Sequence, residues 1–535
     1  MDRDVRVLRA ALIALALTFT ILPLLAALPL FDPDEGLHAA IAQEMATRGD
    51  YVTPTFVGEP FLDKPILFFW SEAWSIRALG SNEAAVRVPP LLFGLLGVAS
   101  TWLLARAMLG DAGAALGAAI AYASMLLPLA VSQVAVHDVG LAPLMNVAVL
   151  ALWRVADGRP SWSITVAGGV CLGLSILTKG LVGVTFAGFA LVAFAAVRSG
   201  AALRLVAAFA VLLAIAVAVA SPWYVAMERA HPGYLHYYFI DRHLRGFLTA
   251  SQPHAEERWW YYVPVIVVGV VPWTVYVWSA VRENARRRAL AACWIWFGLG
   301  FAFLTLSRSK LVTYALPLFP ALAIVLGSTW VRGLRAGGGS FRAALRAHLI
   351  LMFAVALAGM ILTAQRFNVT FPPAAWAAAI AVMMTPLMIA WRARQRGRVV
   401  AAVACASAAA FAVALTLVLP SAARQLSERE LARFFNGRGV LPPRVFLAGD
   451  RVGSIVFYLT PALRADLFPD RIESVDLYQV PERLGSVPPD TVVCVRSHRL
   501  PKFDRFFVNR PLPFAVTPDG EYHLYLVREL IDAIR

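Results

Sequence analysis

The sequence predicts an all-α polytopic membrane protein that carries a small α/β domain at its C-terminal end. Of its 535 residues, 59% are hydrophobic and 15% are charged, and long apolar runs recur from near residue 10 to about residue 420. Soluble domains are nearer half apolar and a quarter charged, and a membrane span needs roughly 20 apolar residues. We therefore expect a transmembrane domain over residues 1–420 and a second domain over residues 421–535.

Thirteen apolar runs are long enough to be membrane spans. The first run follows Arg3, Arg6 and Arg9, is long, and lacks a small-residue cleavage site, so we expect a retained span and not a signal peptide. An odd number of spans places the two ends of the chain on opposite sides of the membrane. The expected spans are residues 8–30, 86–108, 113–132, 139–156, 161–178, 181–198, 203–222, 260–281, 288–307, 312–331, 344–364, 373–391 and 399–420.

The net charge of +15 would suggest nucleic-acid binding in a soluble protein. Here most arginines lie in short loops on alternate sides of the apolar runs, which is the positive-inside pattern of membrane proteins. This pattern predicts a multi-pass protein of the cell inner membrane with a cytoplasmic N-terminus and a periplasmic C-terminal domain. The lipid bilayer is therefore an expected partner, and nucleic acid is not.

Two predicted outer loops are longer than simple connectors need to be. Residues 32–85 contain an amphipathic helical pattern and then a second apolar segment, Pro65–Leu79, and we expect both to form helices that lie in the membrane interface. Residues 228–258 are unusually rich in aromatic and titratable side chains. The apolar stripe of the first helix consists of Leu37, Ala40, Ile41 and Met45.

The composition changes after Pro420, where charged residues return. Residues 444–448 and 491–496 read as strands, and residues 517–520 read as the turn of a hairpin whose second strand covers residues 522–528. These elements predict a small α/β domain on the outer face.

Ionisable residues gather at the outer ends of the predicted spans. Only three lysines precede the C-terminal domain, Lys64, Lys179 and Lys310, and all three lie on this outer side, against the positive-inside trend. Their placement predicts an anionic ligand, and a lipid-linked phosphate fits because lysine acts as a point charge for phosphate and Tyr314 can donate a hydrogen bond. A nearby carboxylate, Asp34 or Asp138, could orient or deprotonate an acceptor hydroxyl.

Each of these residues also has a simpler structural interpretation. Asp34 and Glu35 could cap and charge the N-terminus of the following helix, and Asp138 could cap the fourth span. Lys179 and Lys310 could be anchors that extend toward the interface. Asp63 and His243 could share a divalent metal ion, although two scattered ligands are weak evidence for one and no cofactor is otherwise required.

Eight short strings occur in the order and wording found in the membrane glycosyltransferases of the GT-C class. The sequence most closely resembles the aminoarabinose transferases that modify lipid A, which are related to protein O-mannosyltransferases. The strings are Asp-Glu-Gly-Leu-His-Ala-Ala-Ile-Ala-Gln-Glu-Met at 34–45, Gly-Asp-Tyr-Val-Thr-Pro at 49–54, Phe-Leu-Asp-Lys-Pro at 61–65, Leu-Thr-Lys-Gly at 177–180, Ser-Pro-Trp-Tyr at 221–224, His-Tyr-Tyr-Phe at 236–239, Trp-Trp-Tyr-Tyr-Val-Pro at 259–264 and Ser-Lys-Leu-Val-Thr-Tyr-Ala-Leu-Pro at 309–317.

The resemblance implies a GT-C fold with thirteen spans, two juxtamembrane helices in the first outer loop and a periplasmic C-terminal domain. It also implies inverting transfer of a sugar from undecaprenyl phosphate, most directly 4-amino-4-deoxy-L-arabinose to a phosphate of lipid A. A protein hydroxyl, or another glycan or lipid, remains an alternative acceptor. The main alternative of another class is a transporter of lipid-linked substrates, but the sequence shows neither inverted repeats nor broken helices with polar groups near the bilayer midplane.

By position in these strings, Asp34 resembles the family's first-loop catalytic aspartate and Asp138 its second acidic residue. The resemblance places Lys64, Lys179, His243 and Tyr314 around the donor phosphate, and we add Glu35 and Lys310 to this predicted group. The chain departs from the family pattern at Leu37-His38, where Arg-Tyr is usual, and at Asp63, where Glu is usual. These departures leave the sugar and the acceptor open.

Overall fold

The computed structural model describes residues 2–26, 28–249, 257–284, 288–367, 369–392 and 395–534. The chain forms two compact units. The first, which we call the membrane unit, contains Met1–Ala26, Leu62–Ser71 and Arg87–Val418. The second, which we call the outer unit, contains Ala27–Phe61, Glu72–Val86 and Leu419–Arg535. The outer unit thus joins the segment after residue 418 to most of the predicted first outer loop.

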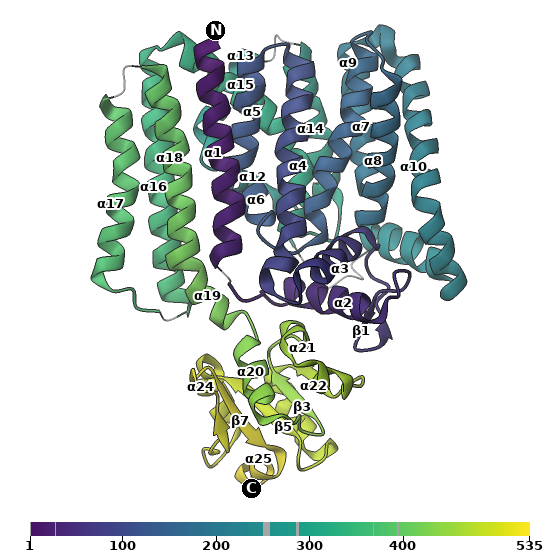
Figure 1. Cartoon of the computed structure of the whole chain (residues 1–535), viewed down its shortest axis with the longest axis vertical. Helices are drawn as coiled ribbons and strands as arrows, with labels where there is room; N and C mark the ends of the chain where they lie inside the picture. Colours follow the sequence, from purple (N-terminus) through teal and green to yellow (C-terminus); the bar gives the residue numbers. More distant parts are fainter. Residues whose placement is uncertain are drawn as a thin grey trace. The chain divides into compact units, whose positions relative to one another are not determined.

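The membrane unit is a bundle of long helices that run roughly parallel to one another (Figure 1). Among the described residues, nine helical segments are long and apolar enough to cross a membrane, a tenth such span is a bent helix pair, and three further apolar helices are shorter. Together they match the thirteen predicted spans one for one, which confirms the predicted helical membrane fold. The helices are α1 (Asp2–Ala26), α4 (Glu83–Leu109), α5 (Ala112–Ser124), α7 (Leu141–Ala156), α8 (Trp162–Lys179), α9 (Val182–Val197), α10 (Ala202–Ala230), α12 (Tyr262–Gly269), α13 (Val277–Asn284), α14 (Arg288–Leu306), α15 (Phe319–Ala336), α16 (Gly339–Phe367), α17 (Pro373–Arg392) and α18 (Arg396–Val413).

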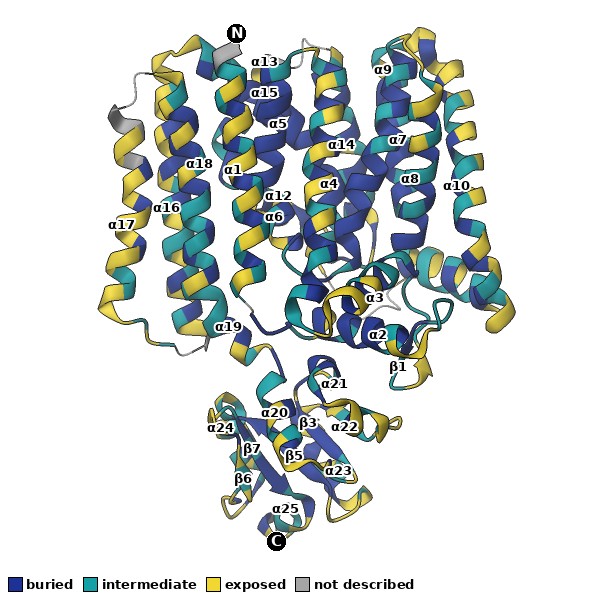
Figure 2. Ribbon diagram, viewed as in Figure 1, coloured by how far each residue is buried: buried dark blue, intermediate teal, exposed yellow. Residues whose placement is uncertain are grey.

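Burial separates the inner helices of this bundle from the outer ones. Helices α5, α7 and α15 are mostly buried, whereas α10 and α17 expose much of their surface (Figure 2). The exposed residues of α10 include Leu203, Val206 and Val217, which are apolar. Exposed apolar surface on long helices is the surface expected to face lipid.

Two predicted spans are interrupted, and a backbone hydrogen bond joins the two interruptions. The predicted span 113–132 ends as α5 at Ser124, and a short helix, α6 (Leu126–Val131), follows. The predicted span 260–281 bends by 96° between α12 and the helical segment that starts at Trp273. Pro272 lies in this bend and cannot donate a helical hydrogen bond. The N–H of Leu126 donates to the carbonyl of Val271 at 3.0 Å. The sequence predicted one continuous span over residues 260–281, and the 96° bend corrects that prediction.

Helices α5 and α15 approach each other through glycines. A Cβ atom added to Gly327 would lie 2.4 Å from both Ala118 N and Gly117 O. Small residues allow this close approach of backbones in membrane helices.

Because of this close contact, adding one methyl group at Gly327 is expected to destabilise the protein. Gly327→Ala is expected to lower the free energy of unfolding by roughly 1–3 kcal/mol because no flexible side chain can give way. The apparent Tm of the purified protein in detergent measures this. Gly359→Ala on α16 is the control, because nothing lies within 4 Å of its added Cβ. Equal Tm values for the two variants would contradict the prediction.

The first-loop part of the outer unit contains the expected amphipathic helix. Helix α2 (Asp34–Arg48) buries Ala40, Ile41 and Met45 of the predicted stripe, but Leu37 is only partly buried. The helix also buries Glu35, His38 and Gln43, so its burial is not confined to the apolar stripe. It is followed by a two-stranded antiparallel hairpin of β1 (Thr55–Phe56) and β2 (Glu59–Pro60). The second predicted helix is α3 (Leu67–Leu79).

The C-terminal part of the outer unit is an α/β fold around a five-stranded sheet with the order β4-β3-β5-β7-β6. Strands β4, β3 and β5 are parallel, and β7 and β6 continue the sheet in antiparallel fashion. The predicted strands are confirmed, but β4 was missed because Glu473 and Ser474 interrupt its apolar pattern. The elements are α19 (Leu419–Gln425), α20 (Arg429–Arg438), β3 (Val445–Ala448), α21 (Ser454–Tyr458), α22 (Pro461–Ala465), β4 (Ile472–Val475), α23 (Val480–Arg483), β5 (Val492–Arg496), α24 (Leu500–Phe503), β6 (Ala515–Val516), β7 (Tyr522–Leu526) and α25 (Val527–Ile534).

Candidate functional site

Lys179 is the centre of a charged cluster in the membrane unit. It is the last residue of α8, and its Nζ forms an ion pair with Oδ1 of Asp138. The same Nζ lies 3.8 Å from the centroid of the Tyr314 ring, which is a cation–π geometry. The side chains of Lys179 and Asp138 are only 14% and 12% exposed. The structure thus brings together three of the predicted site residues, and Lys179 is held by a carboxylate instead of extending as a free anchor.

Asp138 does not cap the fourth span. It lies inside a 3-10 turn, His137–Gly140, and the residue that caps α7 is Gly140, which makes no side-chain cap hydrogen bond. The capping interpretation of Asp138 is therefore wrong. Its carboxylate is used instead to hold the ammonium group of Lys179.

Lys64 belongs to the same neighbourhood. Its charge acts on both Tyr314 and His243. Lys64 is partly buried, and among the described residues no ion pair holds its ammonium group. A half-buried lysine without a carboxylate partner is suited to meet an anionic ligand.

His243 is fixed against the turn that carries Lys179. It lies on the π-helical segment His236–Arg245, and its Nδ1 is 2.9 Å from the carbonyl oxygen of Tyr238. Its Nε2 is 3.4 Å from the carbonyl oxygen of Lys179. Burial lowers the pKa of His243, so the neutral ring is favoured. The two carbonyl contacts act the other way and favour the protonated ring, but burial has the larger effect. His243 therefore contacts the Lys179 turn mainly as a neutral ring.

Asp63 has partners of its own in the same unit. The hydroxyl of Tyr237 donates to Asp63 Oδ1 at 2.6 Å, and Nη2 of Arg242 lies 2.6 Å from Asp63 Oδ2. Burial, with the neighbouring Asp63 carboxylate adding to it, raises the pKa of Tyr237 to about 12. Tyr237 and Arg242 were not among the predicted site residues, although the aromatic and charged density of their loop was a signal.

These contacts do not fit the predicted metal site. Both oxygen atoms of Asp63 face Tyr237 and Arg242, and both ring nitrogens of His243 face carbonyl oxygens. The part of the chain that the structure describes contains no group of three or more His, Cys, Asp or Glu side chains that could hold a metal ion. The described contacts of Asp63 and His243 therefore use the atoms that would have held the ion.

Lys310 lies outside the charged cluster. Its Nζ donates to the carbonyl oxygen of Ser307 in its own turn, and the residue is 4% exposed. Burial and the neighbouring Arg308 lower the pKa of Lys310. No contact of Lys310 with Asp138, Lys179 or Tyr314 is present among the described residues. The structure therefore does not bring Lys310 to the predicted phosphate-binding residues.

Asp34 and Glu35 begin α2 in the outer unit and have different environments. Asp34 is exposed, whereas Glu35 is 1% exposed and its Oε2 accepts a hydrogen bond from the N–H of Phe31 at 2.8 Å. Glu35 thus stabilises the turn before α2, in line with the alternative prediction that it caps the start of this helix. Because Asp34 and Asp138 belong to different units, their meeting in one cavity stays a prediction.

Glu72 is a buried carboxyl group that sequence reasoning missed. It lies on α3, is fully buried, and neither carboxyl oxygen has a hydrogen-bond partner among the described residues. Burial raises the pKa of Glu72 well above its ordinary value, and the nearby charge of Glu35 adds to this effect. Its only signal in the sequence is a single acidic residue within the apolar segment Pro65–Leu79.

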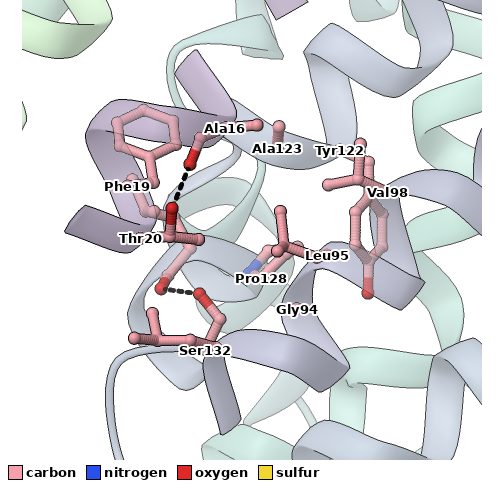
Figure 3. A pocket seen from close by; sticks show the side chains of 12 residues that line it. Ala16, Phe19, Thr20, Gly94, Leu95, Val98, Tyr122, Ala123, Pro128 and Ser132 are labelled. Atoms are coloured by element: carbon pink, nitrogen blue, oxygen red, sulfur yellow. Dashed lines mark hydrogen bonds between the residues drawn. The ribbon is translucent and has the colours of Figure 1, made fainter. Parts of the chain in front are cut away.

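The cavity beside α1 does not suit a charged substrate. It is lined mainly by apolar and small residues of α1, α4, α5 and α6, and its volume is about 30 Å³ (Figure 3). Two of its hydroxyl groups are already used, since Thr20 donates to Ala16 O at 2.8 Å and Ser132 to Leu129 O at 2.7 Å. The charged cluster around Lys179 remains the better candidate.

Comparison with known proteins gives relatives in sequence over part of the chain. The family model described as dolichyl-phosphate-mannose-protein mannosyltransferase matches residues 63–225, which include Lys64, Asp138 and Lys179. The undecaprenyl phosphate-alpha-4-amino-4-deoxy-L-arabinose arabinosyl transferase of Pseudomonas aeruginosa (strain LESB58) is 32% identical over 343 residues, which cover 61% of this chain and 60% of the relative. The enzyme of the same name from Edwardsiella ictaluri (strain 93-146) is 29% identical over 62% of this chain and 60% of the relative. The chain thus matches about 60% of the length of these curated relatives.

Similarity in structure extends over nearly the whole chain. ArnT from Cupriavidus metallidurans bound to undecaprenyl phosphate superposes with a TM-score of 0.71 and 23% identity, covering 97% of both chains. The apo state of that protein gives a TM-score of 0.72 and 22% identity, covering 98% of both chains. Almost from end to end, this chain therefore has the fold of ArnT, with a helical membrane domain and a C-terminal α/β domain.

Proposed function

We propose that this protein is a membrane glycosyltransferase that moves a sugar from an undecaprenyl-phosphate carrier to an acceptor at the periplasmic face of the inner membrane. The favoured reaction transfers 4-amino-4-deoxy-L-arabinose to a phosphate of lipid A. The observation that carries the proposal is the Lys179–Asp138–Tyr314 cluster with Lys64 beside it, in a chain with the fold of a protein solved with undecaprenyl phosphate.

In the proposed reaction, an oxygen of the acceptor attacks the anomeric carbon of the sugar. The bond between that carbon and the carrier phosphate breaks, and the carrier leaves as undecaprenyl phosphate with the bonding electron pair. Lys64 and Lys179 stabilise the negative charge that develops on the leaving phosphate, because fixed cations in a site with little water act strongly on developing charge. Lys179 then exchanges part of its interaction with Asp138 for the phosphate.

Asp34 has a role that depends on the acceptor. A lipid A phosphate is already anionic, so Asp34 would orient it and stabilise the positive charge that develops on the sugar. A hydroxyl acceptor would instead lose its proton to Asp34, which would act as a general base. The match of residues 63–225 to the mannosyltransferase family model favours a protein hydroxyl as the second candidate acceptor.

The proposed orientation has the N-terminus in the cytoplasm and the domain after residue 420 in the periplasm. It rests on the arginines in alternate short loops. One arginine on the proposed cytoplasmic side is Arg335, whose Nη1 and Nη2 contact Asp111 at 2.6 Å and 3.0 Å.

Mass spectrometry of lipid A tests the proposed function. A strain without the gene is complemented with wild type, Asp34→Asn, Asp490→Asn or empty vector; Asp490 is exposed and serves as the matched control. Wild type and Asp490→Asn are expected to add the mass of one amino-pentose, and Asp34→Asn is expected to add none. An unchanged lipid A in all strains would refute the lipid A assignment, and glycosylation of periplasmic proteins in the same strains would then decide for the hydroxyl acceptor.

A further inference from the structure

The first outer loop occupies a place in the α/β fold where such folds usually bind ligands. In parallel sheets, ligands bind beyond the carboxyl ends of adjacent strands whose connections leave in opposite directions. Here those strands are β3 and β5, because β3 leads to β4 on one side while the chain continues from β5 to β6 and β7 on the other. The turn that begins α2 lies at this point, where Asp32 Oδ1 accepts a hydrogen bond from Ser454 N at 2.8 Å.

Further backbone contacts hold the same turn. The N–H of Asp32 donates to the carbonyl of Leu426 at 2.7 Å, and the N–H of Leu30 donates to the hydroxyl of Tyr458 at 2.9 Å. The chain after residue 418 therefore binds this turn from two places, the residue that follows α19 and the helix α21.

Two glycines make this approach close enough. A Cβ atom at Gly453 would lie 2.2 Å from Asp32 Oδ1 and 3.1 Å from Leu37 N. A Cβ atom at Gly36 would lie 2.4 Å from Ser454 N and 2.4 Å from Asp32 Oδ1. Any side chain at either position would separate the two backbones, so the contact requires glycine on both sides.

Charged groups surround the carboxylate of Asp32. Buried Arg496 contacts Asp450 Oδ2 through Nε at 2.8 Å and Glu428 Oε1 through Nη2 at 3.1 Å. Arg499 contacts the other oxygen of Asp450 at 3.0 Å. The hydroxyl of Ser454 donates to Glu428 Oε2 at 2.7 Å. The groups that face Glu428 are Asp32 from the turn, Asp450 after β3, Arg496 on β5 and Tyr522 on β7.

The charges of this group balance when it holds one extra proton. Asp32, Glu428 and Asp450 provide three carboxyl groups against the two guanidinium groups of Arg496 and Arg499. The buried Asp32 Oδ2 finds no donor among the described residues, while the Glu428 carboxyl adjoins that of Asp32. A proton on Glu428 supplies the missing donor. Burial, with the charge of Asp32 adding to it, raises the pKa of Glu428 well above its ordinary value.

We propose that Glu428, Gly453 and Ser454 are positioning residues that bind the Asp32 turn and thereby fix Asp34 at the start of α2 for the transfer reaction. The inference rests on the proposed function in taking Asp34 as a site residue. The α/β domain then contributes to the reaction by holding one loop of its own chain where related sheets would hold a ligand. We call this group of contacts the Asp32 clasp.

Steady-state kinetics of the full-length protein in detergent, with undecaprenyl-phosphate-linked aminoarabinose and lipid A, test the clasp. Gly453→Ala is expected to lower kcat by about 10- to 100-fold, because small misplacements of a reacting group have effects of this size. The KM for the donor is expected to stay unchanged, because the donor phosphate is assigned to lysines of the membrane unit. Gly485→Ala is the control, since nothing lies within 4 Å of its added Cβ.

Substitutions of Glu428 test whether a proton on its carboxyl group is shared with Asp32. Glu428→Gln keeps a donor toward Asp32 and is expected to keep kcat, whereas Glu428→Leu is expected to lower it as Gly453→Ala does. In wild type the protonated form is present below the raised pKa and is lost as the pH rises, so kcat should fall at alkaline pH. Glu428→Gln should lack this alkaline fall. A loss of kcat in Glu428→Gln as large as in Glu428→Leu would overturn the shared proton.

Hydrogen exchange separates failure of the clasp from failure of the proposed function. In Gly453→Ala, the backbone amides of residues 30–37 are expected to exchange at least 10-fold faster than in wild type or Gly485→Ala. This measurement needs no substrate. Unchanged exchange in that segment, or a raised donor KM with unchanged kcat, would overturn the clasp even if the wild-type protein proves to be the proposed transferase. Faster exchange with no transferase activity in wild type would refute the proposed function alone.

Discussion

Lys179→Met is expected to reduce the transfer rate by about 100-fold, which is the effect of removing one preorganised group that stabilises developing negative charge. Its ammonium group is the one that lies against both Asp138 and Tyr314. Methionine has a similar length and no charge, so it keeps most of the packing. Rates of sugar transfer with purified protein measure the effect.

Lys502→Met is the matched control for this substitution, because Lys502 is an exposed lysine of α24 in the C-terminal domain. It should transfer sugar at the wild-type rate. A Lys179→Met variant within 3-fold of wild type would contradict the role of Lys179 at the carrier phosphate.

The double variant Asp138→Asn/Lys179→Met separates catalysis from folding. Lys179→Met alone leaves the mostly buried Asp138 carboxylate without its cation, and breaking such a pair costs roughly 3–5 kcal/mol. Adding Asp138→Asn removes the uncompensated charge, so the apparent Tm should recover while the transfer rate stays low. Recovery of both quantities would show that Lys179 acts only in folding.

Gly180→Ala is expected to raise the KM for the lipid-linked donor by about 10-fold. Gly180 has a φ of 64°, and a Cβ atom there would lie 2.3 Å from His243 Nε2. The backbone conformation alone costs of order 1–3 kcal/mol for a residue with a side chain. The clash would displace either the His243 ring or the turn that carries Lys179. Donor titrations at saturating acceptor measure the change.

Gly188→Ala on α9 is the control for this variant, because the nearest atom lies 3.8 Å from its added Cβ. The double variant Gly180→Ala/His243→Ala removes the clash but keeps the backbone strain. It should therefore bind the donor better than Gly180→Ala alone. If the double variant binds the donor no better, the contact between His243 and the Lys179 turn does not position the lysine.

The membrane helices could be predicted from the sequence because each span must satisfy its own backbone hydrogen bonds and present apolar side chains to lipid. Both requirements are local, so an apolar run is sufficient to find a helix. The spacing of Ala40, Ile41 and Met45 found the helix α2 and three of its buried residues, but it did not show that Glu35, His38 and Gln43 are buried as well. Strand β4 was not found, because Glu473 and Ser474 interrupt its apolar pattern. Their position in a strand is determined by contacts with residues distant in the chain.

The candidate site could be predicted only in part. Asp138, Lys179 and Tyr314 were identified by residue type and by resemblance, but their pairing depends on how three helical segments meet. Lys310 has the same chemistry and a similar place in the sequence as Lys179, yet its ammonium group turns back to Ser307. Sequence position alone does not tell these two lysines apart, because the direction of a long side chain is set by its surroundings.

The paired breaks after Ser124 and at Pro272 have a consequence for how this fold can change in evolution. The hydrogen bond from Leu126 N to Val271 O gives each interrupted helix a partner that an unbroken helix would supply from within itself. A substitution that made one of the two helices continuous would remove this hydrogen bond. It would leave an amide or a carbonyl of the other helix exposed to hydrocarbon. The two interruptions are therefore expected to be conserved together. Homologous chains should have both of them or neither.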